Sequence, residues 1–136
     1  MDVRYLLDTN ICIYIRQKKS PEVMRHFDKL KPGEAGISVI THGELICGAE
    51  KSSHRSEALR RLEELVTVLP ALPIPEAAAH FYGKLRSELE ARGEMIGNND
   101  LWIAAHAISA QLILVTNDED EFRRVRGLKL QNWANA

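Results

Sequence analysis

The sequence predicts an α/β domain with a central, mainly parallel sheet of about five short strands. Two observations lead to this prediction. Short apolar runs typical of buried strands alternate along the chain with longer amphipathic stretches typical of helices, a pattern that favours a parallel sheet covered on both faces. The length of 136 residues, 45% of them hydrophobic, suits one core, so we expect residues 1–136 to form a single domain.

The first half of the chain predicts two strands and four helices. Ser20-Pro21-Glu22 is typical of a helix start, because serine caps, proline suits the first helical position and glutamate complements the dipole. "AGISVI" is a β-branched apolar run, and Thr41 is the expected cap of the helix that follows it. We expect strands at 4–8 and 35–40, and helices at 10–17, 20–30, 41–51 and 54–65.

The second half predicts three strands and three helices. Prolines limit the strand near 68–69 to an edge of the sheet or a loop, and Gly93 is the expected end of the long helix 75–92. Asn98 or Asn99 is the expected cap of the next helix, "DLWIAAHAISA". "LILVTN" is the most strand-like run of the chain. We expect further elements at 112–117 (strand), 120–125 (helix) and 128–133 (strand).

Composition excludes several classes of protein. The sequence has no apolar run of about 18 residues and no signal peptide at its start, so we expect a cytoplasmic protein without a membrane span. Cys12 and Cys47 form neither a disulfide framework nor a metal motif, and both are expected to be small core residues. The net charge of −1 argues against bulk electrostatic binding of nucleic acid.

Four carboxylates lie at junctions between predicted elements. Asp8 ends the first strand, and Asp118 follows "LVTN". Glu44 and Asp100 lie in the first turns of helices. Because functional groups collect outside the carboxyl ends of parallel strands, we expect the four acids to face one crevice. Each acid taken alone is also explained as a helix cap, and Thr41-x-x-Glu44 matches a capping box.

Clustered carboxylates require a cation or a proton, because they repel one another. Oxygen ligands without cysteine or histidine favour Mg²⁺ or Mn²⁺, and a metal that retains water suits hydrolysis of phosphodiester bonds. Five basic side chains are candidates for a rim that holds a polyanion. They are Arg16, Lys18, Lys19, Arg86 and Arg92.

Several motifs together resemble the PIN domain, and in particular the VapC toxins of bacterial type II toxin–antitoxin pairs. They are "YLLDTNICIYI", "ISVITHGELICGAEKS", "IGNNDLWIAAHAI", "LVTND" and "LKLQNW", which span nearly the whole chain. The resemblance implies a three-layer α/β/α PIN-like fold and a Mg²⁺-dependent endoribonuclease that cuts tRNA or rRNA and so inhibits translation and growth. It also implies a homodimer that a VapB-type antitoxin neutralises, in an assembly bound to operator DNA through the antitoxin.

The resemblance also assigns roles to residues. Asp8, Glu44 and Asp100 match the three core acids, with Asp8 and Asp100 on the metal and Glu44 and Asp118 bound directly or through water. Many relatives have Thr-x-Asp-x-Asp-Phe after the last core strand, whereas this chain is one residue longer before Phe122. We therefore prefer Asp118 as the fourth acid and keep Glu121 as its substitute. The supporting residues are expected to be Thr9, Asn10, Thr116 and Asn117.

Two other functions remain as alternatives. One is a structure-specific DNA nuclease on the same fold, and the other is a non-catalytic PIN-like module that binds RNA. The complete acid set argues against the second. Apolar residues of the helices near 21–30 and 54–66 are further candidates for a groove that binds an antitoxin helix. They are Val23, Met24, Phe27, Leu59, Leu62 and Leu65.

Overall fold

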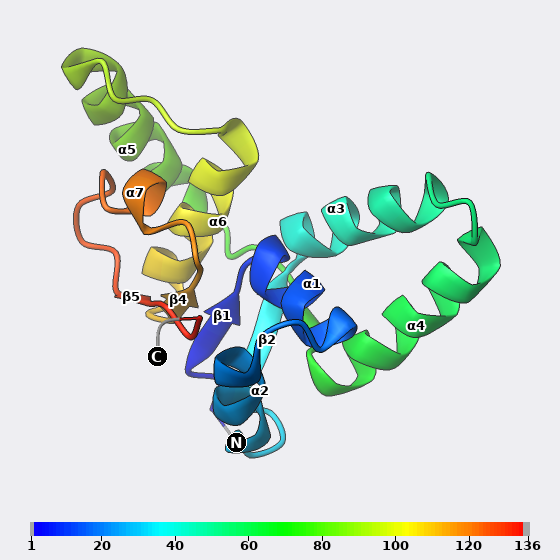
Figure 1. Cartoon of the computed structure of the whole chain (residues 1–136). Helices are drawn as coiled ribbons and strands as arrows, with labels where there is room; N and C mark the ends of the chain where they lie inside the picture. The colour runs from blue at the N-terminus through cyan, green and yellow to red at the C-terminus, as the bar shows by residue number, and fades with distance from the viewer. Residues whose placement is uncertain (1, 135–136) are drawn as a thin grey trace.

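The computed structural model describes residues 2–134, which alternate between strands and helices as the sequence predicts (Figure 1). The elements in chain order are β1 (Tyr5–Leu7), α1 (Thr9–Gln17), α2 (Pro21–Asp28), β2 (Ala35–Ser38), α3 (Val39–Glu50), α4 (Arg55–Val68), β3 (Ala71–Leu72), α5 (Ala78–Arg92), α6 (Asn98–Ser109), β4 (Ile113–Val115), α7 (Glu119–Phe122) and β5 (Leu130–Gln131).

The five strands form one parallel sheet with the order β3-β2-β1-β4-β5. β1 lies at the centre, where Tyr5 is in register with both Ala35 of β2 and Ile113 of β4. All carboxyl ends therefore lie along the same edge, and the predicted sheet is confirmed. The strands are short, with two to four residues each.

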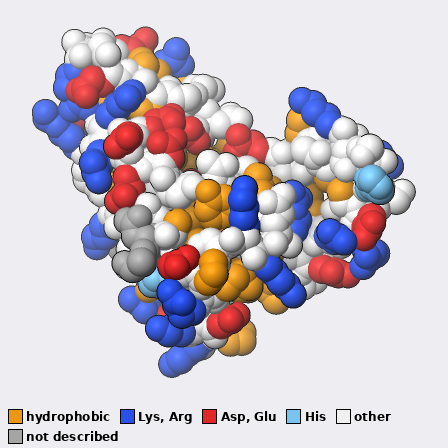
Figure 2. All heavy atoms as spheres, viewed as in Figure 1, with side chains coloured by type: hydrophobic (Ala, Val, Ile, Leu, Met, Phe, Trp, Pro, Cys, Tyr) orange, Lys and Arg blue, Asp and Glu red, His pale blue; other side chains and the backbone are white. Residues whose placement is uncertain are grey.

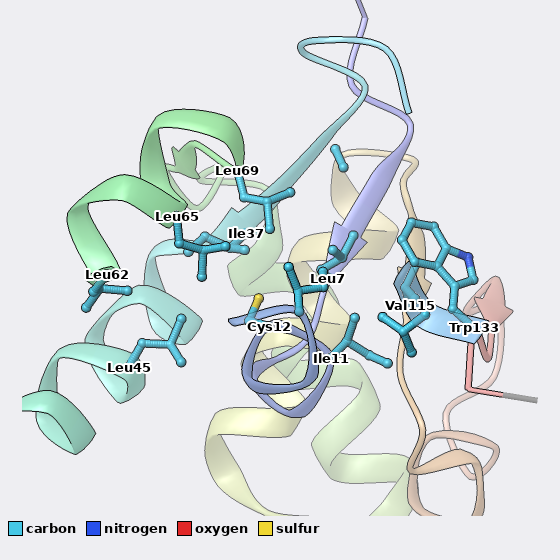
Figure 3. Close-up of a cluster of buried hydrophobic side chains, with 13 residues drawn as sticks. Leu7, Ile11, Cys12, Ile37, Leu45, Leu62, Leu65, Leu69, Val115 and Trp133 are labelled. Atoms are coloured by element: carbon cyan, nitrogen blue, oxygen red, sulfur yellow. The ribbon is translucent and has the colours of Figure 1, made fainter. Parts of the chain in front are cut away.

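Alternation along β1 and β4 divides the core into two halves, because successive side chains of a strand point to opposite faces. Leu7 and Val115 pack with α1, α2 and α4 on one face (Figure 3). Leu6 and Leu114 pack with α5, α6 and α7 on the other. Helices thus cover both faces of the sheet, which gives the expected three layers.

The helix after β2 begins earlier than predicted. Ser38 is its N-cap and accepts a hydrogen bond from the backbone N–H of Ile40 at 3.2 Å, so α3 starts at Val39. Thr41 is fully buried inside the helix. The capping box between Thr41 and Glu44 therefore does not form, which frees the Glu44 carboxylate for contacts across the sheet edge.

The boundary between α4 and β3 also differs from the prediction. α4 continues to Val68, and the edge strand forms at Ala71–Leu72 instead of near 68–69. Leu69 is buried in the core beneath the end of α4, so its apolar character reflects packing and not a strand. A Cβ on Gly36 of β2 would lie 2.9 Å from the Pro70 carbonyl oxygen, so the close approach of this segment requires glycine.

Three smaller expectations have different outcomes. Cys12 is buried as predicted, but Cys47 is exposed on α3, so the prediction of a core position for Cys47 is wrong. Gly93 ends α5 in the left-handed conformation, with φ of 66°, as predicted. The N-cap of α6 is Gly97 and neither of the two asparagines.

No helix within residues 2–134 is both long enough and apolar enough to cross a membrane.

Candidate active site

Asp8 combines the two roles that the sequence left open. Its Oδ1 accepts a hydrogen bond from the backbone N–H of Ile11 at 2.9 Å, which makes it the N-cap of α1. Its backbone N–H donates to the carbonyl of Val115 at 3.0 Å, which fixes the residue between the ends of β1 and β4. The side chain is 5% exposed, so a buried carboxylate stands at the centre of the sheet edge.

Glu44 reaches this edge from the second turn of α3. The hydroxyl of Thr9 donates to its Oε1 at 2.6 Å, and the amide of Asn99 donates to its Oε2 at 3.5 Å. Glu44 thus connects α1, α3 and the first turn of α6. The start of α3 is also joined to the last turn of α6, through a buried hydrogen bond of 2.9 Å between the hydroxyl of Ser38 and His106 Nδ1.

Asp100 lies in the first turn of α6 beside Glu121 of α7. The backbone N–H of Gly97 donates to Glu121 Oε1 at 2.9 Å, which brings α7 against the start of α6. A Cβ on Gly97 would lie 3.4 Å from Asp100 Oδ2 and 3.6 Å from Glu121 Oε1. Both are ordinary contact distances, so the backbone at Gly97 lies directly against the two carboxylates.

Asp118 caps α7, because its Oδ1 accepts a hydrogen bond from the Glu121 backbone N–H at 3.4 Å. The Asp118 N–H donates to Thr116 Oγ1 at 2.9 Å, and Thr116 is hydrogen-bonded to Asp8. The amide of Asn117 donates to the hydroxyl of Tyr14 at 2.9 Å, which ties the loop to α1. The loop after β4 is therefore held from both sides.

The predicted supporting residues have unequal contacts. Thr9 and Thr116 bond to acids, as expected, and Asn117 anchors the loop that carries Asp118. Asn10 is exposed, and its side chain forms no hydrogen bond to any acid of the described chain. Sequence reasoning missed Asn99, whose position directly before Asp100 was the available signal.

The electrostatics agree with a cluster of mutually repelling acids. Burial, assisted by the charges of Asp118 and Glu44 and opposed by the hydrogen bonds from Thr116 and Ile11, raises the pKa of Asp8 to about 6. Burial also raises the pKa of Asp100 to about 7, assisted by contact with Glu121 and by the charges of Glu44 and Asp8. Contact with Glu121 raises the pKa of Asp118. The four predicted acids and Glu121 therefore form one interacting set.

The donor set of this site suits a hard divalent cation. All of its ionisable ligands are carboxylates, which favours Mg²⁺ or Mn²⁺ over zinc. Within residues 2–134, no group of three or more His, Cys, Asp or Glu side chains is arranged to hold a metal ion. Mg²⁺ typically takes only one or two carboxylates and keeps several waters. The raised pKa values of Asp8 and Asp100 indicate that the site favours bound positive charge.

The predicted basic rim divides between the two sides of the molecule. Asp and Glu side chains gather beside α6 and α7, and Lys and Arg side chains lie over α1 and α4 (Figure 2). Arg86 and Arg92 have carboxylate partners on or near α5, at 3.5 Å and 3.1 Å. Arg16 and Lys18 line a hollow between α1 and α4, together with Arg61, which was not among the predicted rim residues.

The fold and the acidic edge define a PIN domain, and the family model of that description matches residues 5–128. The chain belongs to the PIN domain family and, within it, to the VapC ribonucleases. It is 42% identical to ribonuclease VapC2 of Haemophilus influenzae (strain ATCC 51907 / DSM 11121 / KW20 / Rd), over 96% of this chain and 98% of the relative. It is 41% identical to the tRNA(fMet)-specific endonuclease VapC of Shigella flexneri, over 97% and 99%.

A solved complex gives the same result. The crystal structure of VapBC2 from Rickettsia felis bound to a DNA fragment from their promoter superposes with a TM-score of 0.89 at 38% identity. The match covers 98% of this chain and 99% of that one. The predicted PIN-like fold is thereby confirmed, and the chain is a nuclease.

Proposed function

We propose that this nuclease is the toxin of a toxin–antitoxin pair and that it hydrolyses RNA phosphodiester bonds with Mg²⁺, to inhibit translation and growth. The observation that carries the proposal is the single edge at which Asp8, Glu44 and Asp100 meet, with two of these carboxyl groups shifted to pKa values of about 6 and 7. We place its action in the cytoplasm, because RNA is the proposed substrate.

Asp8 and Asp100 are the residues that would hold the metal, with Glu44 and the acids of α7 bound directly or through water. A divalent cation supplies neutralisation of phosphoryl charge and lowers the pKa of water. Glu44 is oriented by Thr9 and Asn99, so it is positioned to accept a proton from an attacking water. Asp8 is fixed by Ile11 and Thr116, which limits its motion during the reaction.

Cleavage of RNA by the purified protein tests this proposal. The protein is incubated with bulk tRNA, with rRNA and with double-stranded DNA, in Mg²⁺, in Mn²⁺ or in EDTA. We expect cleavage of RNA in either metal and none in EDTA, with fragment 5′ ends at few positions. Cleavage of DNA alone would identify the alternative DNA nuclease, and binding without cleavage would identify the non-catalytic module.

The substrate that we favour is a tRNA. The support is the Shigella flexneri relative named a tRNA(fMet)-specific endonuclease, at 41% identity over nearly the whole chain. Sequencing of RNA 5′ ends after induction in cells decides between tRNA and rRNA. New ends confined to rRNA would contradict the tRNA assignment and leave the ribonuclease proposal intact.

The partner that we propose is a VapB-type antitoxin, because the Rickettsia felis relative was solved as a VapBC complex on promoter DNA. The toxin is proposed to be a homodimer in such an assembly. Of the predicted groove residues, Val23 is fully buried in the core. Leu59 and Leu62 line a hollow between α3 and α4, and Leu65 lines one between α1 and α4. Further hollows follow the face of α4 that lies against α1 and α2.

The end of that face of α4 gives a prediction. Val68 is 57% exposed and lines a hollow with Phe27 and Leu30, so an antitoxin segment there would cover apolar surface. We expect Val68→Glu to weaken antitoxin binding about 10-fold, since it places a charge in an apolar contact, with RNA cleavage unchanged. Titration of cleavage with antitoxin measures this. Ile46→Glu tests the other hollow, between α3 and α4, and an equal or larger effect there would contradict the assignment.

The fourth acid gives a second prediction, in which the contacts reverse the preference drawn from the sequence. Glu121 bonds to the Gly97 N–H and lies beside Asp100, whereas Asp118 uses an oxygen to cap α7. We therefore expect Glu121→Ala to reduce cleavage about 10-fold or more and Asp118→Ala to reduce it less. Titration of Mg²⁺ against cleavage rate separates the two variants. A larger loss from Asp118→Ala would restore the original preference.

A further inference from the structure

Two aromatic rings lie stacked on α5 and α6, close to the acidic edge but outside it. The rings of Tyr82 and Trp102 have centroids 3.8 Å apart and planes inclined by 12°. The two helices pack side by side (Figure 1). Both residues are partly exposed, so the pair presents aromatic surface to solvent, although Tyr82 also packs against the core.

Hydrogen bonds fix the orientation of Tyr82. Arg86 Nη1, one turn further along α5, donates to the Tyr82 hydroxyl at 2.9 Å. The hydroxyl in turn donates to the side-chain oxygen of Asn98, the first residue of α6. Hydrogen bonds thereby link the side chains of Arg86, Tyr82 and Asn98. Asn98 precedes Asp100 by two residues in the sequence.

The first turn of α6 connects these linked side chains to the acids. Asn98 and Trp102 are four residues apart and share one face of the helix. Asn99 follows on the helix circumference and contacts Glu44, and Asp100 comes next. A path around the end of α6 therefore leads from the aromatic pair, past two exposed amides, to the carboxylates.

The acids lie beside the proposed cation site and offer only hydrogen-bond acceptors, so they provide neither a stacking surface nor a hydrogen-bond donor for a base. The linked side chains on α5 and α6 provide an aromatic ring, an amide and a guanidinium group. Aromatic faces stack on bases of any identity, amides hydrogen-bond to base edges, and guanidinium groups bind phosphate.

We propose that Tyr82, Asn98 and Arg86 form a base-binding subsite for a nucleotide that flanks the phosphodiester bond cut at Asp8 and Asp100. Tyr82 stacks on the base, Asn98 contacts the base edge, and Arg86 holds the adjoining phosphate. The inference rests on the proposed ribonuclease function. It makes these three side chains contributors to substrate selection, whereas the acids provide the chemistry.

The test compares three variants. Tyr82→Leu removes the aromatic face but keeps an apolar side chain against Trp102, Tyr82→Phe keeps the ring, and Phe81→Ala changes a 37% exposed aromatic on the same helix as the matched control. Binding is measured in an Asp100→Asn background with a single-stranded oligoribonucleotide that contains 2-aminopurine, whose fluorescence is quenched by stacking. KM and kcat are measured in the otherwise unchanged protein, and thermal unfolding verifies the fold.

We expect Tyr82→Leu to weaken RNA binding and raise KM about 10-fold, with kcat changed less than about twofold, because stacking contributes equally before and during the reaction. Tyr82→Phe should retain most of the binding, and Phe81→Ala should match the parent protein. A loss in Tyr82→Phe as large as in Tyr82→Leu would overturn the stacking role.

Two other outcomes would also overturn the proposal. The first is RNA binding that Tyr82→Leu leaves unchanged. The second is a change of oligomeric state in Tyr82→Leu without a loss of RNA binding, which would identify this face as a protein contact. Failure of the ribonuclease proposal itself is distinguishable, because the parent protein would then cleave no RNA. Cleavage by the parent with no effect of Tyr82→Leu would refute the subsite alone.

Discussion

Replacement of Asp100 by asparagine is expected to abolish RNA cleavage while the fold persists. Asparagine keeps the shape of the side chain but removes the charge that would bind the cation. Loss of outer groups around metal sites typically costs about 10–100-fold, so loss of a direct ligand should reduce kcat by about 100-fold or more. Cleavage rates at saturating Mg²⁺ measure the effect, and Asp8→Asn should behave in the same way.

The same substitution should stabilise the metal-free protein at neutral pH. Burial and the neighbouring Glu121 raise the pKa of Asp100 to about 7, so its ionised form is disfavoured in the folded state. Asp120→Asn is the matched control, because it removes one charge from α7 at a side chain that is 95% exposed. Full Mg²⁺-dependent activity in Asp100→Asn would exclude Asp100 as a ligand.

The stability of the metal-free protein should fall as pH rises from about 4 to about 7. Asp8 and Asp100 have ordinary pKa values of 3.8 and folded-state values of about 6 and about 7. Between these limits the folded protein binds more protons than the unfolded chain, so its stability decreases with rising pH. The contribution is fully present below pH 4 and is lost as pH passes through the folded values. At about 1.4 kcal/mol per pKa unit the two shifts set an upper limit of about 7 kcal/mol on this loss, and solvent screening at the partly exposed Asp100 reduces it.

Mg²⁺ should reverse this loss at neutral pH, since a cation replaces the protons that the carboxylates release. Urea unfolding at pH 5, 6 and 7, with EDTA and with Mg²⁺, measures both effects. The slope in EDTA should be smaller in Asp100→Asn and unchanged in Asp120→Asn. An EDTA slope in Asp100→Asn equal to that of the parent protein would contradict the raised pKa of Asp100.

The sequence was sufficient for the parallel sheet and for the edge at which the acids meet. Periodicity and strand-end positions are local properties, and the carboxyl ends of parallel strands must share an edge. Asp8, Glu44 and Asp100 could therefore be predicted together. Element ends were less accurate where packing decides them, as at α3, where Ser38 caps a helix that had been expected to begin at Thr41.

The sequence by itself determined the fold class, the family motifs and three of the acids, because each depends on residue types at short spacings. Only the tertiary structure decided how Glu121 and Asp118 divide their contacts, since that depends on how α7 packs against the start of α6 at Gly97. It alone brought Tyr82 to Asn98, and it alone showed Cys47 to be exposed. These features arise between elements distant along the chain, where side-chain geometry and burial decide and local sequence carries no signal.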